Sequence, residues 1–197
     1  MTRVVGDISI SLDGFVTGPN PGPANGLGDG GEALHTWAFS DDPVDREQLR
    51  SATASSGAVV LGRNLFDVVD GPQGWDDEVG YGAREVGRPP FFVVTSDPPV
   101  HTRLAFWTFV TTGLRDAVAQ AREAAEDGDG DVVLMGGGAT VGSALDAGLL
   151  DVLSLHLSPV VLGDGTPLFV GGHGHALVQR TATPSTTAVH VVYDVVR

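Results

Sequence analysis

Three consecutive glycines follow a short apolar run in the second half of the chain. Residues 132–135 read Val-Val-Leu-Met, Gly136, Gly137 and Gly138 come next, and the residues after them favour a helix. A tight turn from strand to helix is one interpretation of the glycines. The other is a phosphate site, because absent side chains let a phosphate reach backbone N–H groups at the positive end of a helix.

This stretch is not the fingerprint of a Rossmann dinucleotide fold. The third glycine of that fingerprint would fall at Val141, and no acidic residue stands about twenty residues further on, where Ser158 and Pro159 lie. The glycines also come late, after several earlier strand patterns. A different nucleotide-binding fold is therefore expected.

Two further segments place polar groups at the ends of apolar runs. Residues 62–65 (Gly-Arg-Asn-Leu) follow one such run, and Arg63 there could pair with a phosphate through two parallel hydrogen bonds, or with a neighbouring carboxylate instead. Thr95 and Ser96 follow another run, at the strand end where ligands of open α/β sheets collect.

An aspartate stands where the first strand pattern breaks. Asp13 and Gly14 could form a simple turn. Alternatively, Asp13 is a catalytic carboxylate in a cleft, and the long loop rich in glycine and proline at residues 18–31 is a lid over it.

Two histidines spaced two apart, His173 and His175, could chelate a metal. No third ligand continues the motif, and His156 and His190 fall in separate strand patterns. We therefore expect no metal site.

The composition excludes several kinds of catalysis. The chain has 197 residues, no cysteine and no lysine, so all 11 basic residues are arginine. Thiol nucleophiles, cysteine-bound metal centres, Walker A loops and lysine Schiff bases are impossible. The serine-hydrolase motif G-x-S-x-G is absent as well.

The net charge of −14 disfavours nucleic acid and anionic membrane surfaces as partners, and no apolar run is long enough to span a membrane. The first residues enter a strand pattern without a signal-peptide pattern. We therefore expect a cytoplasmic protein that acts on a small molecule.

The elements that must position these residues alternate between strand and helix. Strands are predicted at 3–12, 58–61, 91–95, 108–111 and 132–135, then at 150–162 with an interruption at Pro159; helices are predicted at 43–54, 114–127 and 139–148. Residues 176–183 and 186–196 read as an antiparallel pair. The order predicts one α/β domain over residues 1–197, with three layers, a mostly parallel central sheet and an antiparallel C-terminal edge.

Four segments in this order resemble the dihydrofolate-reductase-like superfamily: SLDGF, LGRNLFD, VVTS and MGGGATVGSALDAGLLDVLSLHLSPVVLGDGTPLF. The chain is most similar to stand-alone relatives of the reductase domain of riboflavin biosynthesis. The resemblance covers nearly the whole chain and is most specific in the last segment. It implies the dihydrofolate-reductase-like fold and NADPH bound across the carboxyl ends of the sheet.

By this resemblance, the glycines hold the pyrophosphate, Arg63 lies near the 2′-phosphate, and the backbone of Ile10 faces the nicotinamide carboxamide. The implied cofactor-binding residues are Ile10, Gly62, Arg63, Asn64, Leu65, Thr95, Ser96, Gly136, Gly137, Gly138, Ala139, Thr140 and Val141. Leu65 replaces a threonine usual in the family, so that one hydroxyl is lost and its backbone amide remains.

The implied activity is hydride transfer from NADPH to a C=N or C=O bond of a small pyrimidine- or pterin-like substrate. Asp13 is the candidate catalytic and substrate-orienting carboxylate, and Trp37, Phe39, Phe66 and Trp75 are candidate walls of the substrate pocket. The folate-reductase signature is not recognisable between residues 18 and 45, which disfavours folate. A nucleotide-binding or structural module without turnover stays open as the alternative.

Association into a homodimer is also expected. The last strand pattern carries several valines (Val189, Val191, Val192, Val195 and Val196) and is more apolar than a solvated sheet edge should be.

Overall fold

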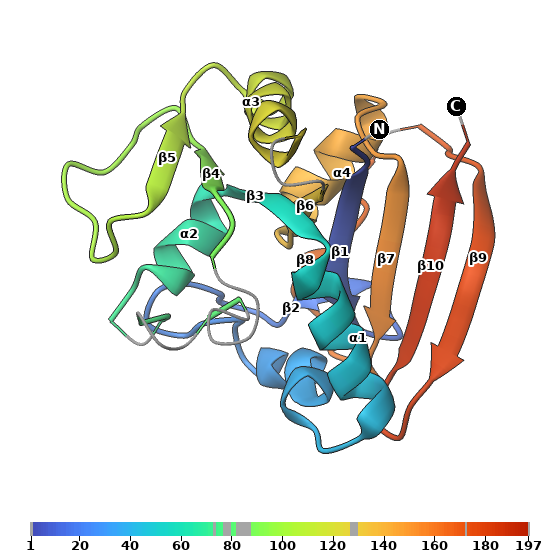
Figure 1. The fold of residues 1–197 in the computed structure, drawn as a ribbon. Helices are drawn as coiled ribbons and strands as arrows, with labels where there is room; N and C mark the ends of the chain where they lie inside the picture. Colours follow the sequence, from blue (N-terminus) through green and yellow to red (C-terminus); the bar gives the residue numbers. More distant parts are fainter. Residues whose placement is uncertain are drawn as a thin grey trace.

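The structure is a computed structural model that describes residues 2–72, 74–76, 80–81, 88–126, 130–171 and 173–196. Its centre is an eight-stranded sheet in the order β5-β4-β3-β6-β1-β7-β10-β9 (Figure 1). The strands are β1 (Val4–Ile10), β3 (Ser56–Gly62), β4 (Phe91–Val94), β5 (Trp107–Val110), β6 (Asp131–Met135), β7 (Val152–Leu157), β9 (Leu177–Pro184) and β10 (Val189–Val195).

The sheet is mostly parallel with an antiparallel end. The six strands from β5 to β7 run parallel to their neighbours, whereas β10 pairs antiparallel with both β7 and β9. The predicted pattern of a parallel sheet with an antiparallel C-terminal edge is therefore confirmed. The edge strand itself is β9, and the valine-rich β10 lies one strand inside it.

Helices cover both faces and complete the three layers. On one face, α3 (Leu114–Glu126) and α4 (Gly138–Asp146) share a core with Ile8 and Val60. On the other face lie α1 (Pro43–Ala54), α2 (Arg63–Val69) and a 3-10 helix, η1 (Gly31–Phe39). A second, small sheet pairs β2 (Phe15–Thr17) with β8 (Thr166–Pro167).

Local signals in the sequence explain where these elements begin and end. The Asp42 side chain accepts a hydrogen bond from the Val44 amide at 2.8 Å, and Pro43 occupies the first turn, so α1 begins where it was predicted. The strand predicted over 150–162 ends at Leu157, before Pro159. The helix η1 was not predicted, because its only sequence signal is the glycine-rich segment before it.

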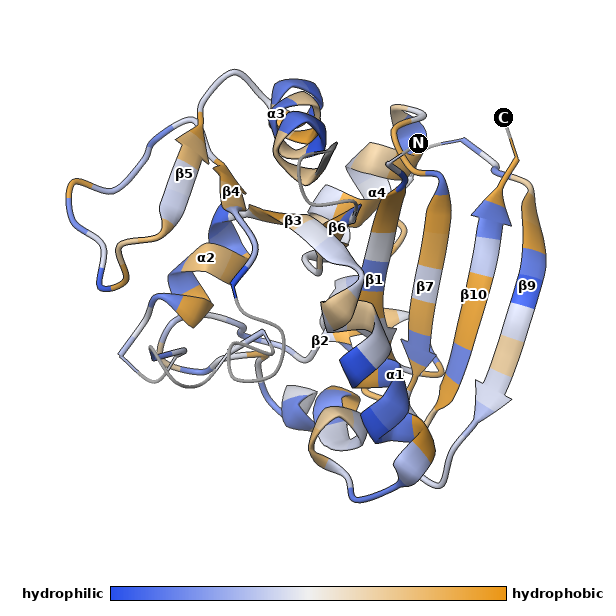
Figure 2. Ribbon diagram, in the orientation of Figure 1, coloured by the Kyte–Doolittle hydropathy of each residue, from blue (hydrophilic) through white to orange (hydrophobic). Residues whose placement is uncertain are grey.

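The two faces of the sheet differ in chemistry. Successive side chains of β1 alternate, so Ile8 faces α4 while Asp7 and Ser9 face η1. The face under α2 holds an aromatic core of Phe66, Phe91 and Trp107 together with Val59 and Leu61. Figure 2 shows hydrophobic segments through the central strands and a more mixed β9 at the edge. None of the described helices is long and apolar enough to cross a membrane.

Candidate functional site

Helices α2 and α4 begin side by side at the carboxyl ends of β3 and β6. A Cβ atom added at Gly62 would lie 2.5 Å from the Thr140 hydroxyl, and one added at Gly136 would lie 3.4 Å from a methyl group of Leu65. Strand β3 lies between β4 and β6, so the carboxyl ends of these three parallel strands share one edge. The structure therefore brings together three of the four segments predicted for the cofactor.

Gly136 and Gly137 form an open turn in front of α4. Their φ angles are 61° and 76°, a region that side-chain-bearing residues rarely adopt. A Cβ atom at Gly137 would meet only the Thr140 side chain, at 3.5 Å, so the space in front of Gly137 is open.

Gly138 lacks a side chain for a different reason. A Cβ atom there would lie 2.9 Å from both the Pro167 carbonyl oxygen and a methyl group of Val16, because the small β2–β8 sheet packs directly on the start of α4. The packing of the protein is therefore sufficient to exclude a side chain at Gly138. The role of Gly138 in cofactor binding stays a prediction.

The backbone amides available to an anion lie earlier than predicted. The amides of Thr140 and Val141 both donate to the Gly137 carbonyl, at 2.9 and 3.1 Å. Within the described part of the chain, the amides of Gly138 and Ala139 have no acceptor. Two free donors beside open space at the positive end of a nine-residue helix fit a pyrophosphate.

Arg63 ties the ends of β3 and β4 together. Its Nε donates to the Asp67 carboxylate at 2.8 Å, and its Nη1 donates to the Asp97 carbonyl, which also accepts from the Thr95 hydroxyl at 3.3 Å. A neighbouring carboxylate, the alternative partner that the sequence analysis gave for Arg63, is thus present. The Arg63 side chain is still 36% exposed, and Asn64 and Ser96 are exposed beside it.

Asp13 is exposed and already holds two turns together. Its carboxylate accepts from the Ser11 hydroxyl at 2.6 Å and from the amides of Leu162 and Gly163 at 3.1 and 2.7 Å. These hydrogen bonds, led by that of Ser11, lower the pKa of Asp13. A carboxylate whose oxygens already accept three hydrogen bonds at this turn suits a positioning role.

Ile10 lies at the end of β1 and is buried. Its carbonyl accepts from the Ser158 amide at 2.9 Å, so the backbone predicted to face nicotinamide already makes one bond to the strand end beside it.

The four aromatic residues predicted to line a substrate pocket do not come together. Phe66 and Trp75 belong to the aromatic core under α2, and Phe66 is 3% exposed. Phe39 is 88% exposed to solvent. Only Trp37 faces the polar side of the sheet, where its indole N–H donates to Ser9 at 2.9 Å and its ring lies 4.0 Å from that of His156.

A buried chain of acidic and histidine side chains lies beside Trp37. His156 Nε2 is 3.1 Å from Asp7, the Nδ1 atoms of His156 and His190 are 2.8 Å apart, and His190 Nε2 is 2.8 Å from Asp45. We name these four residues the Asp–His chain. Sequence reasoning missed it, although alternating polar residues on β7 (Ser154, His156, Ser158) were a signal for a polar sheet face.

Burial and hydrogen bonding act against each other on this face. Burial would raise the pKa of Asp45, but hydrogen bonds from Ser185, Ser40, Thr187 and His190 lower it to about 2. Burial also opposes the lowering at Asp7, where the charge and hydrogen bond of His156 prevail and the pKa lies below its usual value. Burial lowers the pKa of His190, and it lowers that of His35 to about 4 with help from the charge of His156.

The pair His173 and His175 does not assemble with the other histidines. His175 Nε2 lies 2.9 Å from Asp146, whereas His156 and His190 are in the interior. Among the described residues there is no group of three side chains that could hold a metal ion.

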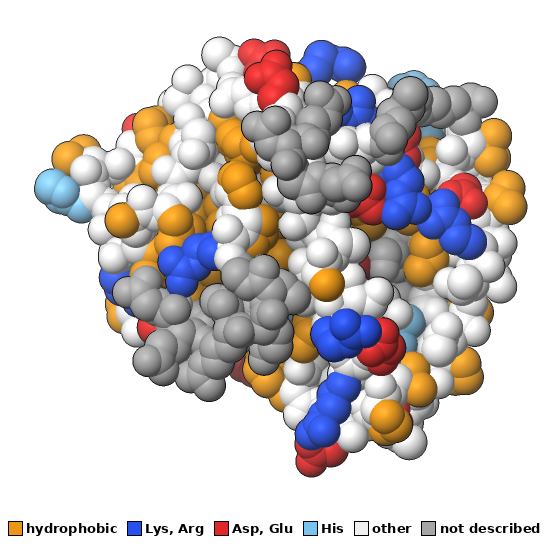
Figure 3. Space-filling view, in the orientation of Figure 1, with side chains coloured by type: hydrophobic (Ala, Val, Ile, Leu, Met, Phe, Trp, Pro, Cys, Tyr) orange, Lys and Arg blue, Asp and Glu red, His pale blue; other side chains and the backbone are white. Residues whose placement is uncertain are grey.

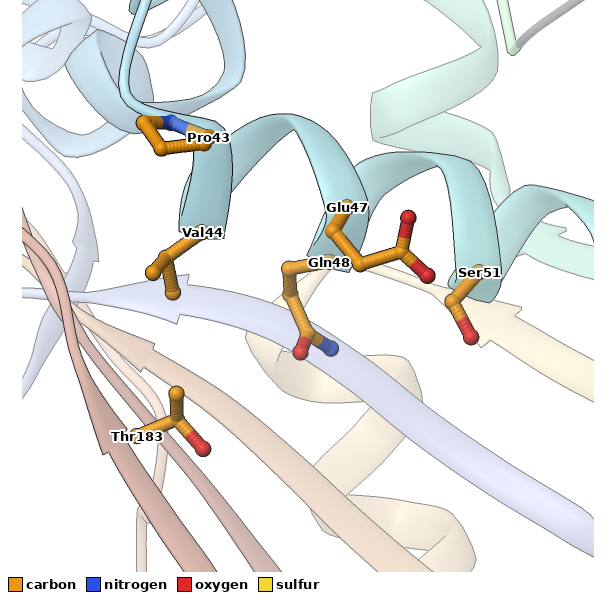
Figure 4. Close-up of a pocket in the computed structure, with 6 residues that line it drawn as sticks. All are labelled: Pro43, Val44, Glu47, Gln48, Ser51 and Thr183. Atoms are coloured by element: carbon orange, nitrogen blue, oxygen red, sulfur yellow. The ribbon is translucent and has the colours of Figure 1, made fainter.

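A separate groove of about 430 Å³ lies between α1 and β9. Figure 4 shows Val44 and Gln48 of α1 pointing toward Thr183 of β9. None of the predicted site residues lines this groove. On the face in Figure 3, several basic side chains lie next to acidic ones. Ion pairs of the described residues include Arg46–Asp41, Arg50–Glu47 and Arg180–Asp194.

The sheet order and the site at its carboxyl edge define an α/β protein of the dihydrofolate-reductase-like fold. The RibD C-terminal domain family matches residues 2–191, and the chain belongs to this family. Membership supports an oxidoreductase activity. Among curated proteins, the uncharacterized protein YyaP of Bacillus subtilis (strain 168) is 22% identical over 198 residues, which cover 97% of this chain and 94% of the relative.

Solved structures agree on the fold. A putative riboflavin biosynthesis protein from Shewanella sp. PV-4 superposes with a TM-score of 0.70 at 20% identity, over 100% of both chains. Dihydrofolate reductase from Enterococcus faecalis, complexed with NADP(H) and RAB-propyl, gives a TM-score of 0.56 at 16% identity, over 98% of this chain and 96% of that one. A deaminase/5-amino-6-(5-phosphoribosylamino)uracil reductase from Thermotoga maritima gives 0.63 at 14% identity, over 99% of this chain and 57% of that one.

Proposed function

We propose that this protein is a reductase that uses NADPH to reduce a C=N or C=O bond of a small pyrimidine- or pterin-like compound. The observation that carries the proposal is the turn before α4. In a chain of the RibD C-terminal domain family, two free amides and an open space at Gly137 lie at the carboxyl edge of the sheet. We also infer that residues 1–197 form one domain.

The residues of the chain would bind and orient the cofactor. The amides of Gly138 and Ala139 would hold the pyrophosphate at the positive end of α4. Residues 62–65, with Thr95 and Ser96, would face the adenosine side, and the backbone of Ile10 would face the nicotinamide. NADPH bound there supplies the hydride, while the protein orients the substrate and excludes water.

Asp13 has the properties of a positioning group in this scheme. It is exposed, anionic and fixed by three hydrogen bonds at the turn that follows β1. We propose that it orients the substrate or the loop that covers it. Of the four aromatic residues, only Trp37 lies on the polar face of the sheet, and we propose that it borders the substrate.

The alternative is a nucleotide-binding module of the same fold without turnover, and Leu65 in place of the usual threonine favours it. Incubation of the purified protein with NADPH and a panel of pterins, pyrimidines and aldehydes separates the two. We expect loss of the reduced-nicotinamide absorbance with at least one compound. A protein that binds NADPH but oxidises it with none of these compounds would be the binding module.

Arg63→Ala is expected to weaken NADPH binding by about one to two orders of magnitude and to change NADH binding little. The guanidinium is the basic group at the strand edge that can meet the 2′-phosphate, and a hydrogen bond to a charged group contributes roughly 1.5–3 kcal/mol. The net charge of −14 acts only weakly at this range, since salt screens charges within about 8–10 Å.

Fluorescence titration with both cofactors measures this effect. Asp67→Asn is the matched control, because it frees Arg63 from its carboxylate partner and leaves the guanidinium in place. Equal losses for NADPH and NADH would show that Arg63 does not read the 2′-phosphate, and a wild type that prefers NADH would overturn the cofactor assignment.

Light scattering at micromolar concentration is expected to return the mass of a homodimer. The edge strand β9 is exposed along nearly its whole length, and Val178 on it is 56% exposed. An exposed sheet edge favours pairing with a second copy. Val178→Lys should shift the mass toward the monomer, whereas a wild type that is already monomeric would contradict the prediction.

A further inference from the structure

The Asp–His chain is continuous from one carboxylate to the other. Asp7 comes from β1, His156 from β7, His190 from β10 and Asp45 from α1, so that four elements distant in sequence contribute. Both ring nitrogens of each histidine are engaged, with three contacts of 3.1, 2.8 and 2.8 Å in a row. No member is redundant in this arrangement.

The contacts fix how many protons the chain holds. Two imidazole nitrogens 2.8 Å apart need one proton between them, because two lone pairs or two N–H groups would repel each other. Each outer contact needs one proton as well, since a carboxylate accepts and cannot donate. Three contacts hold three protons, which with two carboxylates means one imidazolium shared by the two rings.

The chain is closed at one end and open at the other. The Asp45 side chain is 0% exposed, and its oxygens accept from the hydroxyls of Ser40 and Thr187 in addition to His190. The rings of His156 and His190 are each 2% exposed. Asp7 is 23% exposed, so a proton enters or leaves the chain through this carboxylate.

The open end lies next to the proposed cofactor turn. Asp7 is paired in register with Met135, and its carbonyl accepts from the amide of Gly136 at 3.2 Å. Two further titratable groups face it: its charge acts on His35 of η1 and on Tyr81, whose pKa burial and Asp7 both raise. His35 is neutral at pH 7 because burial lowers its pKa to about 4. Neither group competes as a cationic donor there.

We propose that the Asp–His chain is the proton store of the active site and that Asp7 is the catalytic acid that delivers its proton to the substrate. This assignment rests on the proposed reductase function. When hydride reaches the carbon of a C=O or C=N bond, the π electron pair moves to the heteroatom, which must gain a proton. The His156 Nε2–H bond breaks as Asp7 takes that proton, and the Asp7 O–H bond breaks as the heteroatom takes it in turn.

The chain is left with two neutral imidazoles and two carboxylates after the transfer. A carboxylate and a ring lone pair then face each other at Asp7 and His156, which favours uptake of a proton from solvent through the partly exposed carboxylate of Asp7. The buried carboxylate of Asp45 stays ionised throughout, because four donors hold its pKa at about 2. It is a positioning residue that stabilises the imidazolium from the far end.

The proton content is testable without cofactor or substrate. The protein has six histidines. In the triple variant His101→Gln, His173→Gln, His175→Gln, the remaining histidines are the two of the Asp–His chain and His35. Nitrogen NMR of the labelled imidazoles at pH 7 should show three protected N–H protons shared by two rings, one of them shifted far downfield by the contact between rings. Two such protons, or four, would overturn the proposal.

Proton delivery by Asp7 is tested with a compound of the panel that the wild type reduces. Asp7→Asn should lower turnover by about 10²- to 10⁴-fold, with the NADPH dissociation constant unchanged. The matched control is Asp41→Asn, an exposed carboxylate that pairs with Arg46 and is not a member of the Asp–His chain. His190→Gln removes the proton shared between the two rings and should lower turnover with the NADPH dissociation constant unchanged; a merely structural role would lower stability and leave turnover in place.

The two proposals fail in different ways. If the reductase function is wrong, the wild type oxidises NADPH with none of the compounds of the panel. The NMR count of protons then decides by itself whether the Asp–His chain holds a third proton. If the donor assignment is wrong, wild type and Asp7→Asn turn over at the same rate.

Discussion

Gly138→Val is expected to lower the free energy of unfolding by on the order of 3 kcal/mol, whereas Gly137→Ala should leave the fold intact and remove NADPH binding. The two glycines are neighbours in sequence, but Gly138 is packed against the protein and Gly137 borders open space. A Cβ atom at Gly138 runs into Pro167 and Val16, both at 2.9 Å, and the backbone carbonyl cannot move without unpairing β2 from β8.

At Gly137 the added carbon points into open space. The substitution stores roughly 1–2 kcal/mol of strain, because φ is 76° there, and this is small enough for the protein to stay folded. The new methyl group occupies the approach to the amides of Gly138 and Ala139. Urea denaturation and NADPH titration on both variants measure the two effects.

Gly148→Ala serves as the matched control, since Gly148 has a φ of 65° at the far end of α4 and open space around its Cβ position. It also places an alanine at a positive φ and should bind NADPH like the wild type. A Gly137→Ala variant with unchanged NADPH affinity would remove the pyrophosphate from this turn.

Asp45→Ala is expected to destabilise the protein by about 3–5 kcal/mol. The carboxylate is completely buried and accepts from Ser40, Thr187 and His190. Its removal leaves these donors, including the His190 end of the Asp–His chain, without an acceptor. Asp41→Ala, an exposed neighbour, should change stability by less than about 0.5 kcal/mol. Equal urea midpoints for the two variants would contradict the buried network.

The same carboxylate predicts loss of stability in acid. Its folded pKa of about 2 lies below the ordinary value of 3.8, so ionised Asp45 stabilises the fold above pH 3.8, and that contribution, roughly 2 kcal/mol, is lost as pH falls toward 2. His35, with its pKa lowered from 6.5 to about 4, acts in the same direction between those two values. Thermal melts of wild type and Asp45→Asn across this range should converge at low pH.

Much of the fold followed from local pattern. The glycines after residues 132–135, the cap at Asp42 and the alternation of strands with helices determined the order of elements, the mostly parallel sheet and the antiparallel end. These features depend on residues close together in the chain, where periodicity and backbone preference act directly. The resemblance of four motifs extended this to the family, which the match over residues 2–191 confirms.

The site depended on contacts that no local pattern contains. The sequence made Gly136, Gly137 and Gly138 look alike, and only the packing of β2 and β8 against α4 distinguished the third from the first two. Phe66 and Trp75 looked like pocket walls, but the sheet buries them on a separate aromatic core. An aromatic residue in a sequence carries no information on which of two apolar environments will cover it.

The Asp–His chain shows the limit most clearly. By itself the sequence determined the class of this protein, its strand-end glycines and the absence of lysine and cysteine chemistry. Only the tertiary structure decided that Asp7, Asp45, His156 and His190 meet, because 145 residues separate the contacting pair His190 and Asp45, and 149 separate His156 and Asp7. Hydrogen bonds between elements so distant in the chain are set by sheet order and helix packing, which bring the four side chains to one face.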